Sequence, residues 1–97
     1  MKLIYDLLKN NKVVTLPVNN STSLSGFSYN PQTEVLTVLF KRGDIYKYNG
    51  VQKEVIYKIA ELYYANESMG KTLRKYIIGN YNFTRLASDG NIRYQGV

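Results

Sequence analysis

Residues 35–64, VLTVLFKRGDIYKYNGVQKEVIYKIAELYY, change from a strand pattern to a helix pattern within a single stretch. Residues 35–41 and 45–48 alternate their side chains between two faces, as β-strands do, and Gly43 between them suits a hairpin loop. Residues 51–64 instead repeat apolar side chains every three or four positions, which is typical of a helix with one buried face. A hairpin followed directly by a helix that packs on it predicts an α+β fold.

The two strands of this predicted hairpin differ in their faces. Both faces of strand 35–41 are largely apolar, which predicts a central strand covered on both sides. In the second strand, Tyr46 and Tyr48 share one face and Lys47 lies on the other. The connection Arg42-Gly43-Asp44 also matches an integrin-binding tripeptide. A glycine between polar residues is what a hairpin loop requires, so we interpret the tripeptide as a loop.

Two helices are predicted after the hairpin. The first covers residues 51–64, and its apolar stripe is expected to form the centre of the core. This stripe consists of Val51, Val55, Ile56, Ile59 and Leu62. The second covers residues 69–78, with Ser68 as its N-cap. Helical spacing directs Met69, Leu73 and Ile77 to the core. The same spacing leaves an exposed cationic cluster of Lys71, Arg74 and Lys75.

The remaining segments complete a small sheet. A short N-terminal helix is predicted over residues 2–10. Further strands are predicted over residues 13–18, 25–29, 81–86 and 91–94, with a turn at Asp89-Gly90 before the last. The expected fold is a small antiparallel sheet of three to five strands with two helices on one face, plus the N-terminal helix. Residues 1–97 are expected to form one domain, and the order of the strands is left open.

Composition limits the chemistry that this chain can perform. None of its 97 residues is cysteine or histidine, which excludes thiol nucleophiles, disulfides, and the commonest general base and metal ligand. We therefore expect no catalytic residues, no metal, no cofactor and no small-molecule substrate. The sequence shows neither a signal-peptide core nor an apolar run of about 18 residues. We expect a cytoplasmic protein that does not enter the membrane.

Charge and aromatic content indicate a binding role. The chain has 13 basic and 7 acidic residues, hence a net charge of +6, and it has ten tyrosines. Cations and aromatic rings together suit contact with phosphates and unstacked bases, or with an acidic protein surface. The alternative is a basic domain whose tyrosines fill half-buried positions. For Tyr46 and Tyr48, that alternative places both rings under a helix.

Residues 65–72, ANESMGKT, match a loose phosphate-loop pattern that ends in Gly-Lys-Thr. A working phosphate loop follows a buried strand and uses several glycines. Here a helix is predicted before the segment, and Gly70 is its only glycine. The same letters contain Ser68-x-x-Lys71, the nucleophile motif of penicillin-binding proteins, but the companion motifs Ser-Asp-Asn and Lys-Thr-Gly are absent. We reject both enzyme interpretations.

Between residues 21 and 86, short motifs follow one another in a characteristic order. They are Ser21-Thr22-Ser23-Leu24, Leu36-Thr37-Val38-Leu39-Phe40, Tyr46-Lys47-Tyr48, Gly50-Val51, Ser68-x-Gly70-Lys71, Ile77 and Tyr81. The series resembles the KTSC domain, a family named for a C-terminal domain of some lysyl-tRNA synthetases and also found as small stand-alone bacterial and phage proteins. Departures occur at Thr72 and Leu73, where the family often has aromatics, and at Ile78, where it often has a basic residue. The N-terminal helix and strand (1–20) and the C-terminal tail (87–97) lie outside the resemblance.

The resemblance implies that Gly70-Lys71 begins a helix and holds no nucleotide. Through the attachment to a synthetase it also implies RNA binding, so our first hypothesis is a non-enzymatic module for RNA or single strands. Its expected contact residues are Lys41, Arg42, Tyr46, Lys47, Tyr48, Lys71, Arg74 and Lys75. The alternative is a protein-binding modulator, such as a phage-encoded inhibitor of a host or defence protein, for example a CRISPR effector. The sequence leaves the identity of the partner and the oligomeric state open.

Overall fold

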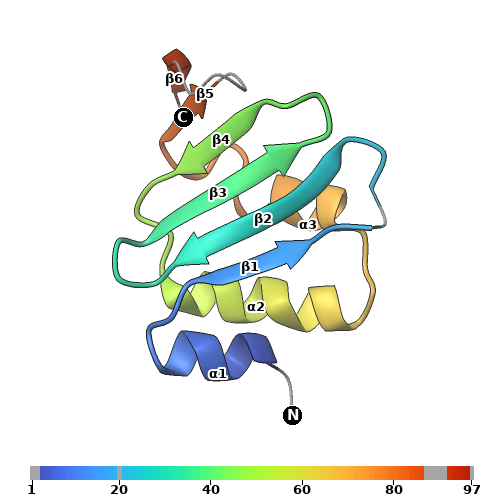
Figure 1. Cartoon of the computed structure of the whole chain (residues 1–97), viewed down its shortest axis with the longest axis vertical. Coiled ribbons are helices and arrows are strands. Elements are labelled where there is room, and N and C mark those ends of the chain that lie inside the picture. Colours follow the sequence, from blue (N-terminus) through green and yellow to red (C-terminus); the bar gives the residue numbers. More distant parts are fainter. Residues whose placement is uncertain (1–2, 20, 87–91, 97) are drawn as a thin grey trace.

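Six antiparallel strands form one sheet, and three helices pack on a single face of it (Figure 1). The computed structural model describes residues 3–19, 21–86 and 92–96, and the side chains of the first two ranges. The strands lie side by side in chain order: β1 Val14–Pro17, β2 Leu24–Asn30, β3 Val35–Phe40, β4 Ile45–Tyr48, β5 Phe83–Leu86 and β6 Ile92–Gly96. The helices are α1 Leu3–Lys9, α2 Lys53–Tyr64 and α3 Met69–Tyr76. Both α2 and α3 lie between β4 and β5 in the chain. The helices therefore interrupt the succession of strands along the chain, while β4 and β5 are still neighbours in the sheet.

Tight turns connect β2, β3 and β4. After β2, the Asn30 side-chain oxygen accepts a hydrogen bond from the Gln32 N–H at 3.0 Å, and Glu34 adopts a φ of 57°. After β3, Gly43 has a φ of 97°, and its N–H donates to the Phe40 carbonyl at 2.9 Å. Such a positive φ carries little cost only for glycine. The predicted hairpin loop at Arg42-Gly43-Asp44 is therefore confirmed.

Helices cover only one face of the sheet. On β3, the inward residues Leu36 and Val38 are 0% and 2% exposed. The outward residues of β3 are half-buried: Val35, Thr37 and Leu39. The prediction that this strand is covered on both faces is wrong, because β-branched and leucine side chains also suit the open surface of a pleated sheet. Polar residues of the neighbouring strands, Ser28 and Lys47, lie beside Thr37 on this open face.

One hydrophobic core joins the inward face of the sheet to all three helices. Its largest fully buried side chains are Ile4, Leu8, Val14, Phe27, Tyr29, Leu36, Val51, Ile56, Ile59, Met69, Leu73 and Ile77. On α2, Ile56 and Ile59 lie in the core as predicted, while Val55 and Leu62 pack at its margin. The helical stripe read from the sequence therefore determines which side of α2 faces the sheet.

In the connection from β4 to α2, one residue, Val51, is buried while its neighbours are exposed. Val51 precedes α2, which begins at Lys53, two residues later than predicted. The Val51 N–H donates to the Glu34 carbonyl at 2.9 Å, and its carbonyl accepts from the Tyr29 hydroxyl at 2.6 Å. Val51 and Tyr29 are both 0% exposed. These two hydrogen bonds tie the N–H and the carbonyl of Val51 to the turn after β2 and to β2 itself. Val51 therefore stays outside the helix, which begins two residues later.

Replacing Tyr29 by phenylalanine should lower the free energy of unfolding by about 1–2 kcal/mol, because the buried Val51 carbonyl loses its donor. Burial raises the pKa of Tyr29 to about 12 from an ordinary value of 10.0. A raised pKa means that the folded state disfavours the tyrosinate, so this group's stabilisation is complete below pH 10 and is lost as pH rises towards 12. Urea denaturation at pH 7 and pH 11 should show the advantage of the wild type shrinking at the higher pH.

Tyr57→Phe is the matched control for this substitution. Tyr57 is half-buried, and its hydroxyl makes no hydrogen bond to any part of the chain that the structure describes. We expect its loss to change the unfolding free energy by less than about 0.5 kcal/mol. Equal effects of the two substitutions at pH 7 would contradict the role assigned to the Tyr29 hydroxyl.

Tyrosines fill the space between α1 and α2. The Tyr5 ring stacks on Tyr57 with centroids 5.9 Å apart and lies 5.7 Å from the Tyr64 ring. The Ile4 N–H donates to the Tyr64 hydroxyl at 3.0 Å. Throughout the described side chains, every tyrosine is buried or half-buried. The aromatic content of the sequence therefore serves packing to a large extent.

The α+β class, the single antiparallel sheet and the short N-terminal helix are confirmed. The strand β6 raises the strand number to six, one more than the predicted three to five, because the terminal hairpin extends the same sheet. The predicted turn at Asp89-Gly90 lies outside the described residues. Within the residues that the structure describes, none of the helices has the length and apolar character that crossing a membrane requires.

Candidate functional site

The helix α3 has a fixed orientation, because both of its ends are tied down. At the N-terminus, the Ser68 hydroxyl accepts a hydrogen bond from the Lys71 N–H at 3.3 Å, so the predicted N-cap is confirmed. At the C-terminus, α3 ends at Tyr76, two residues before the predicted end; the Ile77 and Ile78 N–H groups both donate to the Leu73 carbonyl at 2.9 Å, and Gly79 follows with a φ of 86°. The predicted inward residues Met69, Leu73 and Ile77 are each at most 1% exposed. The outward side of α3 must therefore face solvent.

Three cations occupy this outward side: Lys71, Arg74 and Lys75, all exposed as predicted. Among the residues with described side chains, no carboxylate lies within ion-pair distance of any of them. The Lys75 ammonium lies 5.3 Å from the centroid of the Tyr76 ring, close enough for a cation–π contact. The positive charge on α3 is therefore available to a partner.

Lys41 joins these cations from the end of β3. Its ammonium donates a hydrogen bond to the Ser21 carbonyl at 2.7 Å. A methyl group on Gly70 would lie 4.0 Å from the Ser21 hydroxyl, so the Ser21 loop adjoins the first turn of α3. We call Lys41, Lys71, Arg74 and Lys75 together the basic face. It combines one residue directly after β3 with three residues of the helix.

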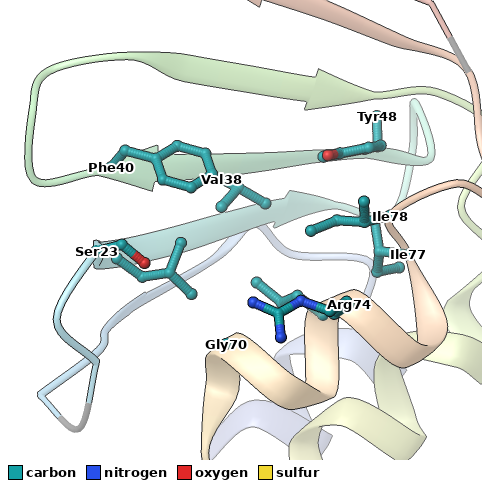
Figure 2. A pocket seen from close by; sticks show the side chains of 10 residues that line it. Ser23, Val38, Phe40, Tyr48, Gly70, Arg74, Ile77 and Ile78 are labelled. Carbon is teal, nitrogen blue, oxygen red and sulfur yellow. The ribbon is translucent and has the colours of Figure 1, made fainter.

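An apolar pocket of about 70 Å³ opens beside the basic face, between α3 and the inward side of β2, β3 and β4 (Figure 2). Its walls are Leu24, Val38, Phe40, Tyr48, Gly70, Leu73, Ile77 and Ile78. Two polar side chains, those of Ser23 and Arg74, complete the lining. In Figure 2 the Arg74 guanidinium lies close to the α3 ribbon, on the side of the helix that faces the strands. Ile78, which is 47% exposed, stands at the edge of the same pocket.

The tyrosine pair of β4 points towards the helices. Tyr48 is 3% exposed, and burial raises its pKa. Tyr46 is half-buried between Phe40 and Phe83, with ring centroids 4.9 and 5.3 Å away. The expected open stacking face is therefore not formed, because these rings complete the end of the core. The alternative that both rings pack under a helix holds for the burial of Tyr48, whereas Tyr46 packs on rings of the neighbouring strands β3 and β5.

The last two predicted contact residues lie away from the basic face. Lys47 is exposed on the open face of the sheet, opposite the helices. Arg42 lies in the β3–β4 loop, where its guanidinium is 3.4 Å from the Asp44 carboxylate. The same carboxylate accepts a 2.9 Å hydrogen bond from Arg85, which raises the pKa of Arg85. Asp44 thus connects this loop to β5, and Arg42 is engaged at the margin of the fold.

Sequence reasoning missed the pocket, although one signal pointed to it. Ile78 is an apolar residue directly after the last core position of α3, where the helical spacing calls for an exposed side chain. The other lining residues come from four separate elements, and only the packed structure brings them together. Among the described residues, no three or more aspartate, glutamate, cysteine or histidine side chains gather in a way that could hold a metal ion.

Comparison with known proteins agrees with the fold and the motifs. The model of the KTSC domain family matches residues 20–81. The chain belongs to the KTSC domain family. The crystal structure of a KTSC domain protein from Yersinia pestis superposes with a TM-score of 0.61 at 20% identity, covering 77% of this chain and 99% of that one. At this identity the similarity shows the fold alone. No curated protein matches the chain.

The KTSC match ends at Tyr81, so β5, which the sequence resemblance included, lies beyond it. Four of the matched segments meet at one place in the fold. They are the Ser21–Leu24 motif, β3, the Tyr-x-Tyr of β4 and the start of α3. Each of them contributes at least one wall residue to the apolar pocket. In this KTSC domain, ANESMGKT covers the connection between α2 and α3 and the first turn of α3, so a helix precedes it and no strand does.

Proposed function

We propose that this chain is a small, non-enzymatic, cytoplasmic module that binds nucleic acid, as RNA or single strands, through the basic face. The observation that carries the proposal is the group of three exposed cations on one rigid helix, with no carboxylate among the described side chains within ion-pair distance. Ammonium and guanidinium groups in such a row suit the phosphates of a flexible strand. The net charge of +6 supports the same assignment.

The proposal differs from the sequence-based hypothesis in its contact residues. Tyr48 is in the core, so the affinity must come from the four cations of the basic face and not from a Tyr46–Tyr48 platform. Four neutralised phosphates on a single strand give a slope of log K against log salt of about −3. Affinity for the strand should then fall roughly fifty-fold between about 50 and about 200 mM salt.

The test is a titration of fluorescent single-stranded RNA and DNA at these two salt concentrations. The double substitution Arg74→Glu with Lys75→Glu should abolish most of the binding and flatten the salt slope. It should weaken the binding of all RNA and DNA sequences alike, since phosphate contacts carry no sequence information. The control is Lys9→Glu with Lys12→Glu, which changes the net charge equally at exposed positions near α1. Absence of binding at about 50 mM salt, or equal losses in the two double variants, would contradict the proposal.

A protein-binding modulator, for example a phage-encoded inhibitor of a host or defence protein, is the second candidate. The observation that favours it is Ile78, a large apolar side chain that is 47% exposed at the edge of an apolar pocket. Binding of that kind depends on buried apolar contacts and changes little with salt. A partner recovered equally well from nuclease-treated and untreated lysate, and lost on Ile78→Asp, would support this second function.

A further inference from the structure

We propose that a groove between α3 and the end of α2 takes an unstacked base of the bound strand, which lies on the ring of Tyr76 while Lys71 and Lys75 hold the flanking phosphates. This inference rests on the proposed function and assigns a base contact that the basic face alone lacks. The groove shares no lining residue with the apolar pocket beside Arg74. The observations that carry the proposal are the size of the groove, the aromatic ring in its wall and the charges that line it.

The groove is large enough for a base, and its two sides are fixed by hydrogen bonds. Its volume is about 270 Å³, whereas a cavity of about 150 Å³ already binds benzene. On the α2 side, the Glu67 N–H donates to the Leu62 carbonyl at 3.0 Å. On the α3 side, the Thr72 hydroxyl donates to the Ser68 carbonyl at 2.8 Å. Of the described residues that line the groove, only Thr72 is buried, so a ligand can enter without displacing the core.

Tyr76 gives the groove an aromatic wall that is open to a partner. Its ring is half-buried, and none of the described aromatic side chains stacks on it. Its hydroxyl makes no hydrogen bond within the described parts of the chain. Unstacked bases of single strands bind to such rings, and any base can do so because every base has a π-face. Tyr76 therefore supplies the stacking surface that the Tyr46–Tyr48 pair does not.

The charges along the groove suit a neutral base with phosphates on either side. Lys71 and Lys75 are exposed and lie one helical turn apart, and the Lys75 ammonium is 5.3 Å from the centroid of the Tyr76 ring. One carboxylate, that of Glu67, also belongs to the described lining. A phosphate inside the groove would be repelled by this carboxylate, whereas a base carries no charge. The groove is therefore complementary to the base, and the two exposed ammonium groups are complementary to the phosphates.

The experiment compares fluorescent strands of equal length and charge with and without bases. Oligouridylate, whose bases stack only weakly on one another, should bind the wild type about tenfold more tightly than an abasic strand, as expected when one base stacks on an aromatic ring. Tyr76→Leu should remove this preference, because leucine keeps the wall apolar but has no ring. It should leave the affinity for the abasic strand and the salt slope unchanged, since both lysines remain. Tyr76→Phe should retain the preference.

Tyr57→Leu is the matched control. Tyr57 is also half-buried, but it lies on α2 and stacks on Tyr5 of α1, with ring centroids 5.9 Å apart, so it does not line the groove. This variant should keep the full preference for oligouridylate. A second measurement needs no substitution: a strand that carries one photoreactive iodouridine, irradiated in complex with the wild type, should crosslink to Tyr76, as identified by mass spectrometry.

The outcomes separate the base groove from the proposed function. Equal binding of oligouridylate and the abasic strand by the wild type would overturn the base groove and leave the proposed function standing. Binding of neither strand would overturn both. A preference that persists in folded Tyr76→Leu, a preference lost equally in Tyr57→Leu, or crosslinks confined to other residues would each overturn the groove. If Tyr76→Leu does not fold, the crosslinked residue decides.

Discussion

Replacing Ile59 by alanine should lower the free energy of unfolding by about 2–5 kcal/mol. Ile59 lies in the middle of α2, is 0% exposed and belongs to the core that joins the helices to the sheet. The substitution removes three methyl or methylene groups from a close-packed site and leaves a cavity that the neighbouring side chains fill only in part. A domain of this size has a total stability of roughly 5–10 kcal/mol. The loss should therefore be a large fraction of the whole.

Urea denaturation followed by circular dichroism measures this change. Lys58→Ala is the matched control on the same helix, because Lys58 is exposed and makes only a solvent-exposed ion pair with Glu61 at 3.5 Å. Its effect should stay below about 0.5 kcal/mol. If Ile59→Ala cost no more than this control, the assignment of α2 as the central core helix would be wrong.

Gly26→Ala should destabilise the protein by about 3 kcal/mol, at the upper end of the range for an overpacked site. A methyl group at this position would lie 2.8 Å from the Leu16 carbonyl oxygen of β1. The obstructing atom belongs to the backbone, so no rotation of a side chain can relieve the clash. The strand β1 would have to move away from β2, where Gly26 is paired with Pro17.

The matched control for Gly26→Ala is Gly70→Ala, the same chemical change in another element. Gly70 lies in the first turn of α3, and its added methyl group makes only ordinary contacts at 3.8 and 4.0 Å. Alanine is a better helix former than glycine, so this variant should be as stable as the wild type or slightly more stable. Thermal unfolding of the two variants compares them directly. Equal melting temperatures would show that β1 approaches β2 less closely than described.

The orientation of α3 was predictable from local spacing, whereas the location of the tyrosine pair was not. Met69, Leu73 and Ile77 recur at helical intervals, so their burial follows from the chain itself and the exposure of Lys71, Arg74 and Lys75 follows with it. For Tyr46 and Tyr48, alternation determines only that they share a face. Which face the helices cover depends on contacts between distant segments, and these place Tyr48 in the core.

The same distinction explains why the apolar pocket and the position of Lys41 could not be predicted. The pocket requires α3 to lie across β2, β3 and β4 at one particular distance, which no periodicity encodes. Lys41 reaches the neighbourhood of α3 only through the Ser21 loop, whose carbonyl it binds. The prediction that β3 is covered on both faces failed for a related reason. The composition of a strand does not reveal whether a second layer covers its outer face.

The order of the strands in the sheet has a consequence for how the chain assembles. Strands β1 to β4 are neighbours both in the sheet and along the chain, so they can pair by closing short loops. The strand β5 reaches β4 only across the helical segment, whose ends are joined by the Asn49 N–H donating to the Asn82 carbonyl at 2.9 Å. Closing a long segment costs more chain entropy, and such pairings form late. We therefore expect the β5–β6 hairpin to be the last part of the sheet to join during folding and the first to separate in the native protein.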